Sequence, residues 1–297
     1  MEAEFFPILF KIADEKSNSS QKKFININLS ILILLILSSL SSIFTEQISA
    51  PKPLIIFCTC CLILSTLLNL FILFFRPEKS WYEGRAIAES VKTLTWKLIT
   101  GTAPFNLSLS DKEYQSIFSE NLKKIIGQKK DFFILIGKKY PNENMISDEM
   151  IEIRKSSFES RKKIYLEARI QNQIDWYSKN SKKNSKNKNI TFIFMIGFQI
   201  LGILFFILEL NSLIKFSFTS IAITLTSIFL TWLQLKRFQE LTESYAITAM
   251  ELKFIKDKSR FVTNDNELAK YVDDSETAIS REHTLWLARR DNVELYN

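Results

Sequence analysis

Five hydroxyl side chains recur at helical spacing within one apolar stretch of the chain: Ser217, Ser220, Thr224, Ser227 and Thr231. Steps of three and four residues place all five on the same face of an α-helix. Small hydroxylated residues let membrane helices approach closely and hydrogen-bond to one another. The same stripe could instead form the polar wall of a pore. The pattern therefore has two interpretations, helix packing and pore lining.

A second polar stripe and one isolated amide lie in other apolar stretches: Cys58, Cys61, Ser65, Asn69 and Gln199. Amides inside apolar helices usually hydrogen-bond a neighbouring helix, so we interpret these residues as packing or pore-lining candidates. All three cysteines fall within residues 58–61, and the single histidine, His283, is far away in the sequence. A metal site would need further ligands. We therefore expect the thiols to be packing residues, and we expect neither a metal nor a cofactor.

The elements that must position these side chains are four apolar runs without a charged residue: 24–45, 53–75, 189–208 and 216–235. About 20 apolar residues suffice for an α-helix to cross the hydrocarbon core of a bilayer. In lipid each such segment must satisfy its backbone amides internally, which favours helices. Short connections join the first run to the second and the third to the fourth. The sequence thus predicts an all-α membrane protein with two transmembrane hairpins and long amphipathic helices outside the bilayer.

Charge is unevenly distributed along the chain, which carries 39 Lys and Arg against 32 Asp and Glu. Basic residues concentrate beside the span ends on one side, and such residues mark the cytoplasmic side of a membrane. We expect a multi-pass protein of a bacterial inner membrane with both termini in the cytoplasm. One basic run adjoins the third span and predicts contacts with anionic lipid, or less favourably with a phosphate group: Lys179, Lys182, Lys183, Lys186 and Lys188.

These patterns divide the chain into five segments: a cytoplasmic arm (1–23), the first hairpin (24–75), a basic helical region (76–188), the second hairpin (189–235) and C-terminal helices (236–297). Each hairpin starts and ends on the same side of the membrane. The two halves therefore form a parallel internal repeat, related by an axis along the membrane normal.

The segments outside the membrane are also expected to be helical. Phe5 to Ile12 could form a short interfacial helix. A helix should begin near Glu78 and be stopped by Gly101 and Pro104, and another should cover about 111–127. An apolar run follows at 132–136. The remaining expectations are a long helix running with few breaks from Ser147 into the third span, a fourth span continuing unbroken to Arg260, and a last helix starting near Asp274.

Known catalytic patterns are absent from the sequence. It contains neither G-x-x-x-x-G-K-S/T nor G-x-G-x-x-G, and one histidine is too few for the common histidine-based metal and triad schemes. We expect no enzymatic activity. The tryptophans are interpreted as interface and packing residues rather than base-stacking platforms, so no nucleic-acid partner is expected.

Three stretches resemble a known family. They are GRAIAESVKTLTWK from Gly84 with APF at 103–105, RKKIYLEARIQNQIDWYSKNSKKNS over 161–185, and AISREHTLWLARR over 278–290. Together they resemble the SLATT proteins, the SMODS- and SLOG-associating two-span effector domains, in a tandem four-span form.

The resemblance implies a membrane effector of bacterial immunity or conflict systems. Such a protein would interact with the lipid bilayer, form a homo-oligomer, and open a pore or disrupt the membrane when triggered by a nucleotide second messenger or a sensor protein. The alternative is a constitutive membrane scaffold or small ion channel without a lethal state.

Overall fold

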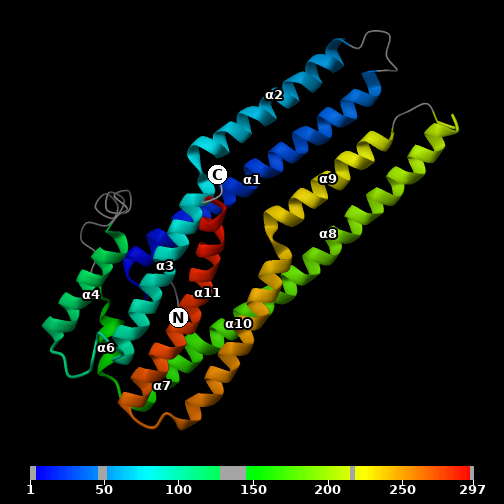
Figure 1. Ribbon diagram of the computed structural model, residues 1–297. Coiled ribbons are helices and arrows are strands. Elements are labelled where there is room, and N and C mark those ends of the chain that lie inside the picture. Colours follow the sequence, from blue (N-terminus) through cyan, green and yellow to red (C-terminus); the bar gives the residue numbers. More distant parts are fainter. Residues whose placement is uncertain (1–4, 46–51, 128–144, 215–217, 295–297) are drawn as a thin grey trace. The chain divides into compact units, whose positions relative to one another are not determined.

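The computed structural model describes residues 5–45, 52–127, 145–214 and 218–294. Every regular element in these ranges is helical. The helices are α1 (Ile8–Thr45), α2 (Lys52–Phe75), α3 (Pro77–Thr100), α4 (Asp111–Ile126), α6 (Asp148–Lys155), α7 (Phe158–Ile164), the π-helix η1 (Tyr165–Gln171), α8 (Asn172–Leu210), α9 (Phe218–Lys236), α10 (Phe238–Lys258), the 3₁₀ turn η2 (Ser259–Phe261) and α11 (Asp265–Glu294) (Figure 1).

The chain forms two compact units. The span unit comprises Gln21–Glu78 and Asn180–Glu243, and it contains the four apolar runs. The packed unit comprises Met1–Ser20, Lys79–Lys179 and Ser244–Asn297. Helices α1, α3, α8 and α10 each contribute residues to both units.

The span unit is built from the apolar parts of α1, α2, α8 and α9, which run alongside one another (Figure 1). Ser38 of α1 lies 2.9 Å from Cys58 of α2, and Ser39 of α1 lies 3.1 Å from Thr224 of α9. A Cβ atom on Gly202 of α8 would lie 3.3 Å from the methyl group of Ala222 on α9. The contacts therefore give the order α2, α1, α9, α8.

All four helices of the span unit are long and apolar enough to cross a membrane. Large apolar side chains point outward along them, and Phe74, Ile193 and Ile203 are each more than half exposed. Such an apolar exterior suits hydrocarbon rather than water. The predicted all-α membrane architecture with four spanning helices is confirmed.

The second helix of each hairpin ends at an arginine in the left-handed conformation. Arg76 (φ 42°) separates α2 from α3, and Arg237 (φ 48°) separates α9 from α10. The prediction that the fourth span continues unbroken to Arg260 is therefore wrong, because a left-handed residue cannot continue a right-handed helix. The two breaks occupy equivalent places in the two halves, as expected for an internal repeat.

The packed unit encloses one apolar core around Trp96, Phe105, Phe118 and Tyr165, all less than 2% exposed. Residues before the first span join this core, since Phe5 and the first turn of α1 are buried in it. The expectation of a short interfacial helix over Phe5 to Ile12 is wrong, because this segment is the buried start of α1 itself. Its apolar side chains are covered by protein.

Local capping residues explain three other helix boundaries. Helix α3 ends before Gly101, whose φ of 73° suits glycine, and α4 follows the capping box of Ser110, so both predicted helices are confirmed. The long helix predicted from Ser147 is interrupted, because Ser157 caps a new helix, α7. From Phe158 the helical backbone runs to Leu210. The predicted apolar run at 132–136 lies outside the described residues.

The last helix begins nine residues earlier than predicted, at Asp265 rather than Asp274. Asn264 Oδ1 accepts a hydrogen bond from the backbone N–H of Glu267 at 3.0 Å. The Glu267 carboxylate in turn accepts from the N–H of Thr263 at 2.7 Å. This reciprocal pairing satisfies two backbone donors at the helix start, whereas Asp274 lies inside the helix.

Gly84 lies where α3 approaches the backbone of α1 closely. A Cβ atom at this position would lie 2.9 Å from both the carbonyl oxygen of Ala13 and the backbone nitrogen of Ser17. Both atoms belong to the backbone of α1 and cannot move aside as a flexible side chain can. Gly84→Ala is therefore expected to destabilise the packed unit by about 1–3 kcal/mol through overpacking. Thermal unfolding of the full chain in detergent measures this loss.

Gly197→Ala is the matched control for Gly84→Ala, since a Cβ atom on Gly197 meets nothing within 4 Å. This substitution should be neutral or stabilising by up to about 1 kcal/mol through helix propensity. Equal effects of the two substitutions would contradict the close helix contact at Gly84.

Candidate functional site

Part of the predicted hydroxyl stripe lines a groove in the span unit. The groove has a volume of about 270 Å³ and opens to the surface of the unit. Six hydroxyl side chains define this hydroxyl groove: Ser38, Ser39 and Ser42 of α1, and Thr224, Ser227 and Thr231 of α9. Apolar side chains of both helices and Leu62 of α2 complete its walls.

Hydrogen bonds within each helix leave the groove hydroxyls with spare acceptor capacity. Thr224, Ser227 and Thr231 donate to the carbonyl four residues earlier at 2.9, 3.0 and 2.8 Å. Each hydroxyl oxygen has two acceptor lone pairs. The donors are therefore satisfied in the absence of water, while the oxygens can accept bonds from water or from another helix.

The other members of the stripes lie elsewhere in the span unit. Ser220 is exposed on α9, and Ser217 lies outside the described residues. On α2, Cys61 and Ser65 are buried, and Cys58 contacts Ser38 of α1. Asn69 and Gln199 are exposed on their helices, and Asn69 donates to the carbonyl of Ser65 at 3.0 Å. The structure thus gathers only part of the stripes into one groove.

The three α1 serines of the groove were missed by the sequence reasoning. Their signal is the run Ser38-Ser39-Leu40-Ser41-Ser42 inside an otherwise aliphatic span. Small hydroxylated residues of this kind are typical of contacts between membrane helices. The run could have been noticed, but its pairing with α9 could not, since 185 residues separate Ser39 from Thr224.

The predicted basic run does not form a single site. Four of its members are exposed on α8, while Lys188 lines a different cavity of the span unit. The exposed lysines are Lys179, Lys182, Lys183 and Lys186. Among the described residues, no group of three His, Cys, Asp or Glu side chains could hold a metal ion.

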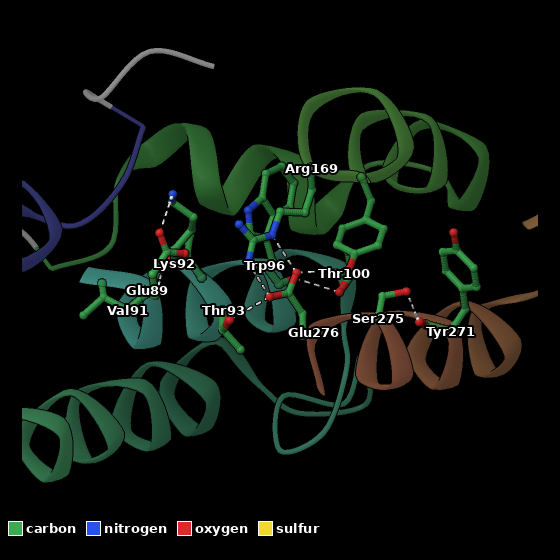
Figure 2. A network of polar contacts seen from close by, with 12 residues as sticks. Glu89, Val91, Lys92, Thr93, Trp96, Thr100, Arg169, Tyr271, Ser275 and Glu276 are labelled. Atoms are coloured by element: carbon green, nitrogen blue, oxygen red, sulfur yellow. Dashed lines mark hydrogen bonds and ion pairs between the residues drawn. The ribbon is translucent and has the colours of Figure 1, made fainter. Parts of the chain in front are cut away.

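A buried ion pair links two helices of the packed unit (Figure 2). Arg169 of η1 and Glu276 of α11 are 1% and 0% exposed. The guanidinium donates from Nε to Oε1 at 2.9 Å and from Nη2 to Oε2 at 2.7 Å. Tyr165 Oη donates to Oε1 at 3.0 Å, and Thr93 Oγ1 of α3 donates to Oε2 at 2.7 Å. The Glu276 carboxylate therefore joins three helices through four hydrogen bonds.

The electrostatics of this network follow from its burial. Desolvation alone would lower the pKa of Arg169, but the adjacent Glu276 carboxylate outweighs it and raises the pKa above the ordinary value. Complete burial and then the Glu276 charge raise the pKa of Tyr165 well above 10. Nearby, burial lowers the pKa of Lys92, and Glu89 at 3.5 Å only partly offsets this. Arg169 hence stays charged and Tyr165 stays a hydrogen-bond donor near neutral pH.

Sequence reasoning missed this network as well. Tyr165 and Arg169 lie one turn apart within residues 161–185, one of the stretches that resemble the family. Thr93 lies within another, the stretch that begins at Gly84. Glu276 lies two residues before the last of these stretches, residues 278–290. An arginine between Ala168 and Ile170 on a half-apolar helix was the available signal. Its acidic partner could not be inferred, since it lies 107 residues away in the chain.

A second buried arginine fixes the connection between α3 and α4. Arg154 of α6 is 5% exposed and donates from Nη1 to the carbonyls of Leu98 and Phe105 at 2.7 and 2.8 Å. Its Nη2 donates to the carbonyl of Asn106 at 2.8 Å, and its guanidinium lies 4.3 Å from the Tyr114 ring centroid. The Leu98 and Asn106 carbonyls also accept the backbone N–H groups of Gly101 and Leu109 at 3.3 and 3.1 Å, so the guanidinium adds a second hydrogen bond to each. We interpret Arg154 as structural.

The fold and these sites define an all-α protein with four potential membrane-spanning helices and a helical unit that contains a buried ion pair. Residues 7–162 match the family model of SMODS and SLOG-associating 2TM effector domain 3, and residues 165–286 match that of domain 1. Each matched range contains two of the four spanning helices. The chain belongs to the SLATT family of two-span effector domains, and carries two of them in tandem. It matches no curated protein and no solved structure.

Proposed function

We propose that this chain is a membrane effector of a bacterial immunity or conflict system. It oligomerises in the inner membrane and permeabilises the bilayer when a partner or a nucleotide signal triggers it. The observation that carries this proposal is the hydroxyl groove, a polar surface along helices whose length and composition suit a membrane span. Its occurrence in a tandem of effector domains gives the groove a functional context.

The groove supports pore formation because its polar hydroxyl groups are poorly solvated by hydrocarbon. Lipid tails offer no hydrogen bonds to the six hydroxyl oxygens. If several copies assemble around one axis with their grooves facing inward, these oxygens instead face a shared aqueous path. A homo-oligomer therefore both covers the polar surface and creates the conduit. The chain itself performs no catalysis in this proposal.

A trigger can reach the spans through continuous helix. The backbone is helical from Phe158 to Leu210, so Arg169 and the third apolar run belong to one uninterrupted segment. A signal that rearranges the packed unit around Arg169 can thus move this span directly. The family description names association with SMODS and SLOG modules. We propose that a partner of this kind, or the nucleotide it makes or senses, is the trigger.

The orientation follows the charge distribution. Basic residues flank the spans at the same ends as the packed unit's segments, and such residues are retained on the cytoplasmic side. We propose that both termini and the packed unit are cytoplasmic. In this orientation a cytoplasmic signal has direct access to the packed unit.

Membrane potential in living cells tests the proposal. The full chain is expressed in bacteria with and without the genes adjacent to its own, and a voltage-sensitive dye reports depolarisation. We expect depolarisation and growth arrest when an adjacent trigger gene is active, and tolerance otherwise. Unchanged potential in both conditions would favour the membrane scaffold. Depolarisation in both conditions would favour a constitutive channel.

A further inference from the structure

A second cavity of the span unit lies away from the hydroxyl groove, between α8 and the junction of α9 with α10. Its volume is about 690 Å³, within the roughly 300–1,000 Å³ of ordinary ligand pockets. Its lining comprises Lys188, Asn189, Phe192, Met195, Leu230, Leu233, Gln234, Arg237, Gln239 and Glu240. We call it the boundary pocket, because it straddles the ends of the third and fourth apolar runs.

The lining of the boundary pocket is polar at one end and apolar at the other. Phe192 and Met195 follow Lys188 by four and seven residues, and Leu230 and Leu233 precede Arg237 by seven and four. At about 1.5 Å per helical residue, the apolar floor lies roughly 6–10 Å deeper than the basic pair along both helices. Two basic residues therefore mark one level of the pocket and four apolar residues mark the deeper level.

Both basic side chains are suited to an anion at the mouth. Lys188 makes no ion pair or hydrogen bond with its side chain among the described residues. Arg237 pairs with Glu240 through Nη2, and a guanidinium has five donors in all. Glu240 competes for this arginine, so an entering anion has to share the guanidinium with the Glu240 carboxylate or displace that carboxylate. Gln239 is engaged elsewhere, donating to Glu243 at 3.1 Å.

The backbone conformation at Arg237 places this residue at a break between two helices. Its φ of 48° is in the left-handed region, which disfavours a residue with a Cβ atom and typically marks functional or tightly constrained positions. This conformation breaks the helix between Lys236 and Phe238, and Arg237 itself lines the pocket. Arg76 has the same conformation at the equivalent junction of the first hairpin, so the left-handed backbone is common to both junctions and the adjoining pocket is what distinguishes Arg237.

We propose that the boundary pocket binds an anionic phospholipid. Lys188 and Arg237 hold the phosphate, while Phe192, Met195, Leu230 and Leu233 contact the upper acyl chains. The level of each group matches that of a lipid in a bilayer, with the phosphate at the interface and the chains in the apolar run. Basic pockets between spanning helices on the cytoplasmic side are typical sites for anionic headgroups. This site stands independently of the effector function proposed above.

Native mass spectrometry of the full chain in detergent tests the lipid site. Phosphatidylglycerol and phosphatidylcholine with identical acyl chains are added in turn, and bound lipid is quantified. Each basic residue near an anionic surface contributes about fivefold in binding. We therefore expect Lys188→Gln with Arg237→Asn to weaken phosphatidylglycerol binding by about 30-fold, with little effect on phosphatidylcholine. Asparagine is chosen at Arg237 because it tolerates the left-handed conformation.

The first hairpin offers a matched control. Arg76 has the same left-handed conformation and Lys23 precedes the first span, but the Lys23 ammonium lies 4.8 Å from the Phe71 ring centroid. Lys23→Gln with Arg76→Asn removes the same charge at the equivalent place and should change binding less than about twofold. Arg237→Lys should retain most of the binding, because it keeps the charge.

Three results would overturn the proposal. Equal binding of the two lipids to the unmodified protein would exclude charge recognition, and this comparison needs no variant to fold. Equal losses in the boundary-pocket and control variants would show diffuse electrostatic attraction. Equal affinity for glycerol 3-phosphate or ATP, with competition against the lipid, would assign the pocket to a soluble phosphate ligand instead.

Discussion

Replacing Glu276 by alanine is expected to lower the free energy of unfolding of the packed unit by about 3–5 kcal/mol, because the buried Arg169 guanidinium then lacks a counter-charge. Tyr165 and Thr93 lose their acceptor at the same time. Tryptophan fluorescence provides the measurement, since the ring of Trp96, one of five tryptophans in the chain, lies 5.6 Å from that of Tyr165 in the same core. Denaturant unfolding of the full chain in detergent should show the lower midpoint.

Two comparison variants separate the ion pair from general damage to α11. Asp273→Ala removes a half-exposed carboxylate, 2.5 Å from Lys97, from the same helix, and should cost only about 0–1 kcal/mol. Glu276→Leu with Arg169→Met removes both charges, and should recover much of the stability lost in Glu276→Ala. A loss below about 1 kcal/mol for Glu276→Ala would contradict the structural role of the network.

Removing the α9 hydroxyls of the groove is expected to abolish most conductance while leaving assembly nearly intact. The variant combines Thr224→Val, Ser227→Ala and Thr231→Val, which keep side-chain volume close to the original. Of the hydrogen bonds described for these three side chains, the Ser39–Thr224 contact is the one that crosses between helices, and such bonds average about 0.6 kcal/mol in membranes. A water-filled path is more sensitive, because an apolar constriction closes by dewetting. We expect conductance to fall by roughly tenfold or more.

Conductance and oligomer size must be measured in the same preparation for this test. Thr59→Val, Thr66→Val and Thr226→Val form the matched control. These threonines also donate to the carbonyl four residues earlier, at 2.8, 2.9 and 2.9 Å, but none lines the groove. The control should conduct normally. Normal conductance from a correctly assembled groove variant would show that the stripe packs helices and lines no pore.

Properties that depend on a short window of residues were determined by the sequence alone. Four charge-free runs are long and apolar enough to be spanning helices, because length and composition decide this without any partner. The extents of α3 and α4 were predicted closely, with a start near Glu78, a stop at Gly101 and a second helix over about 111–127, because the residues that end a helix act over one helical turn. The family was also accessible, since three stretches of local sequence resembled it. The start of α11 was a local feature that was misread, because the cap at Asn264 was overlooked in favour of Asp274.

Tertiary structure decided which polar groups meet. A 3–4 spacing places Thr224, Ser227 and Thr231 on one face of α9, but it cannot tell which helix that face meets. The answer, α1, depends on packing between segments about 185 residues apart. Arg169 and Glu276 are likewise 107 residues apart, and each looks like an ordinary surface charge in its own helix. Burial requires them to pair, because a carboxylate removed from water without hydrogen bonds has a large free-energy cost. The Glu276 carboxylate accepts two hydrogen bonds from Arg169 and one each from Tyr165 and Thr93.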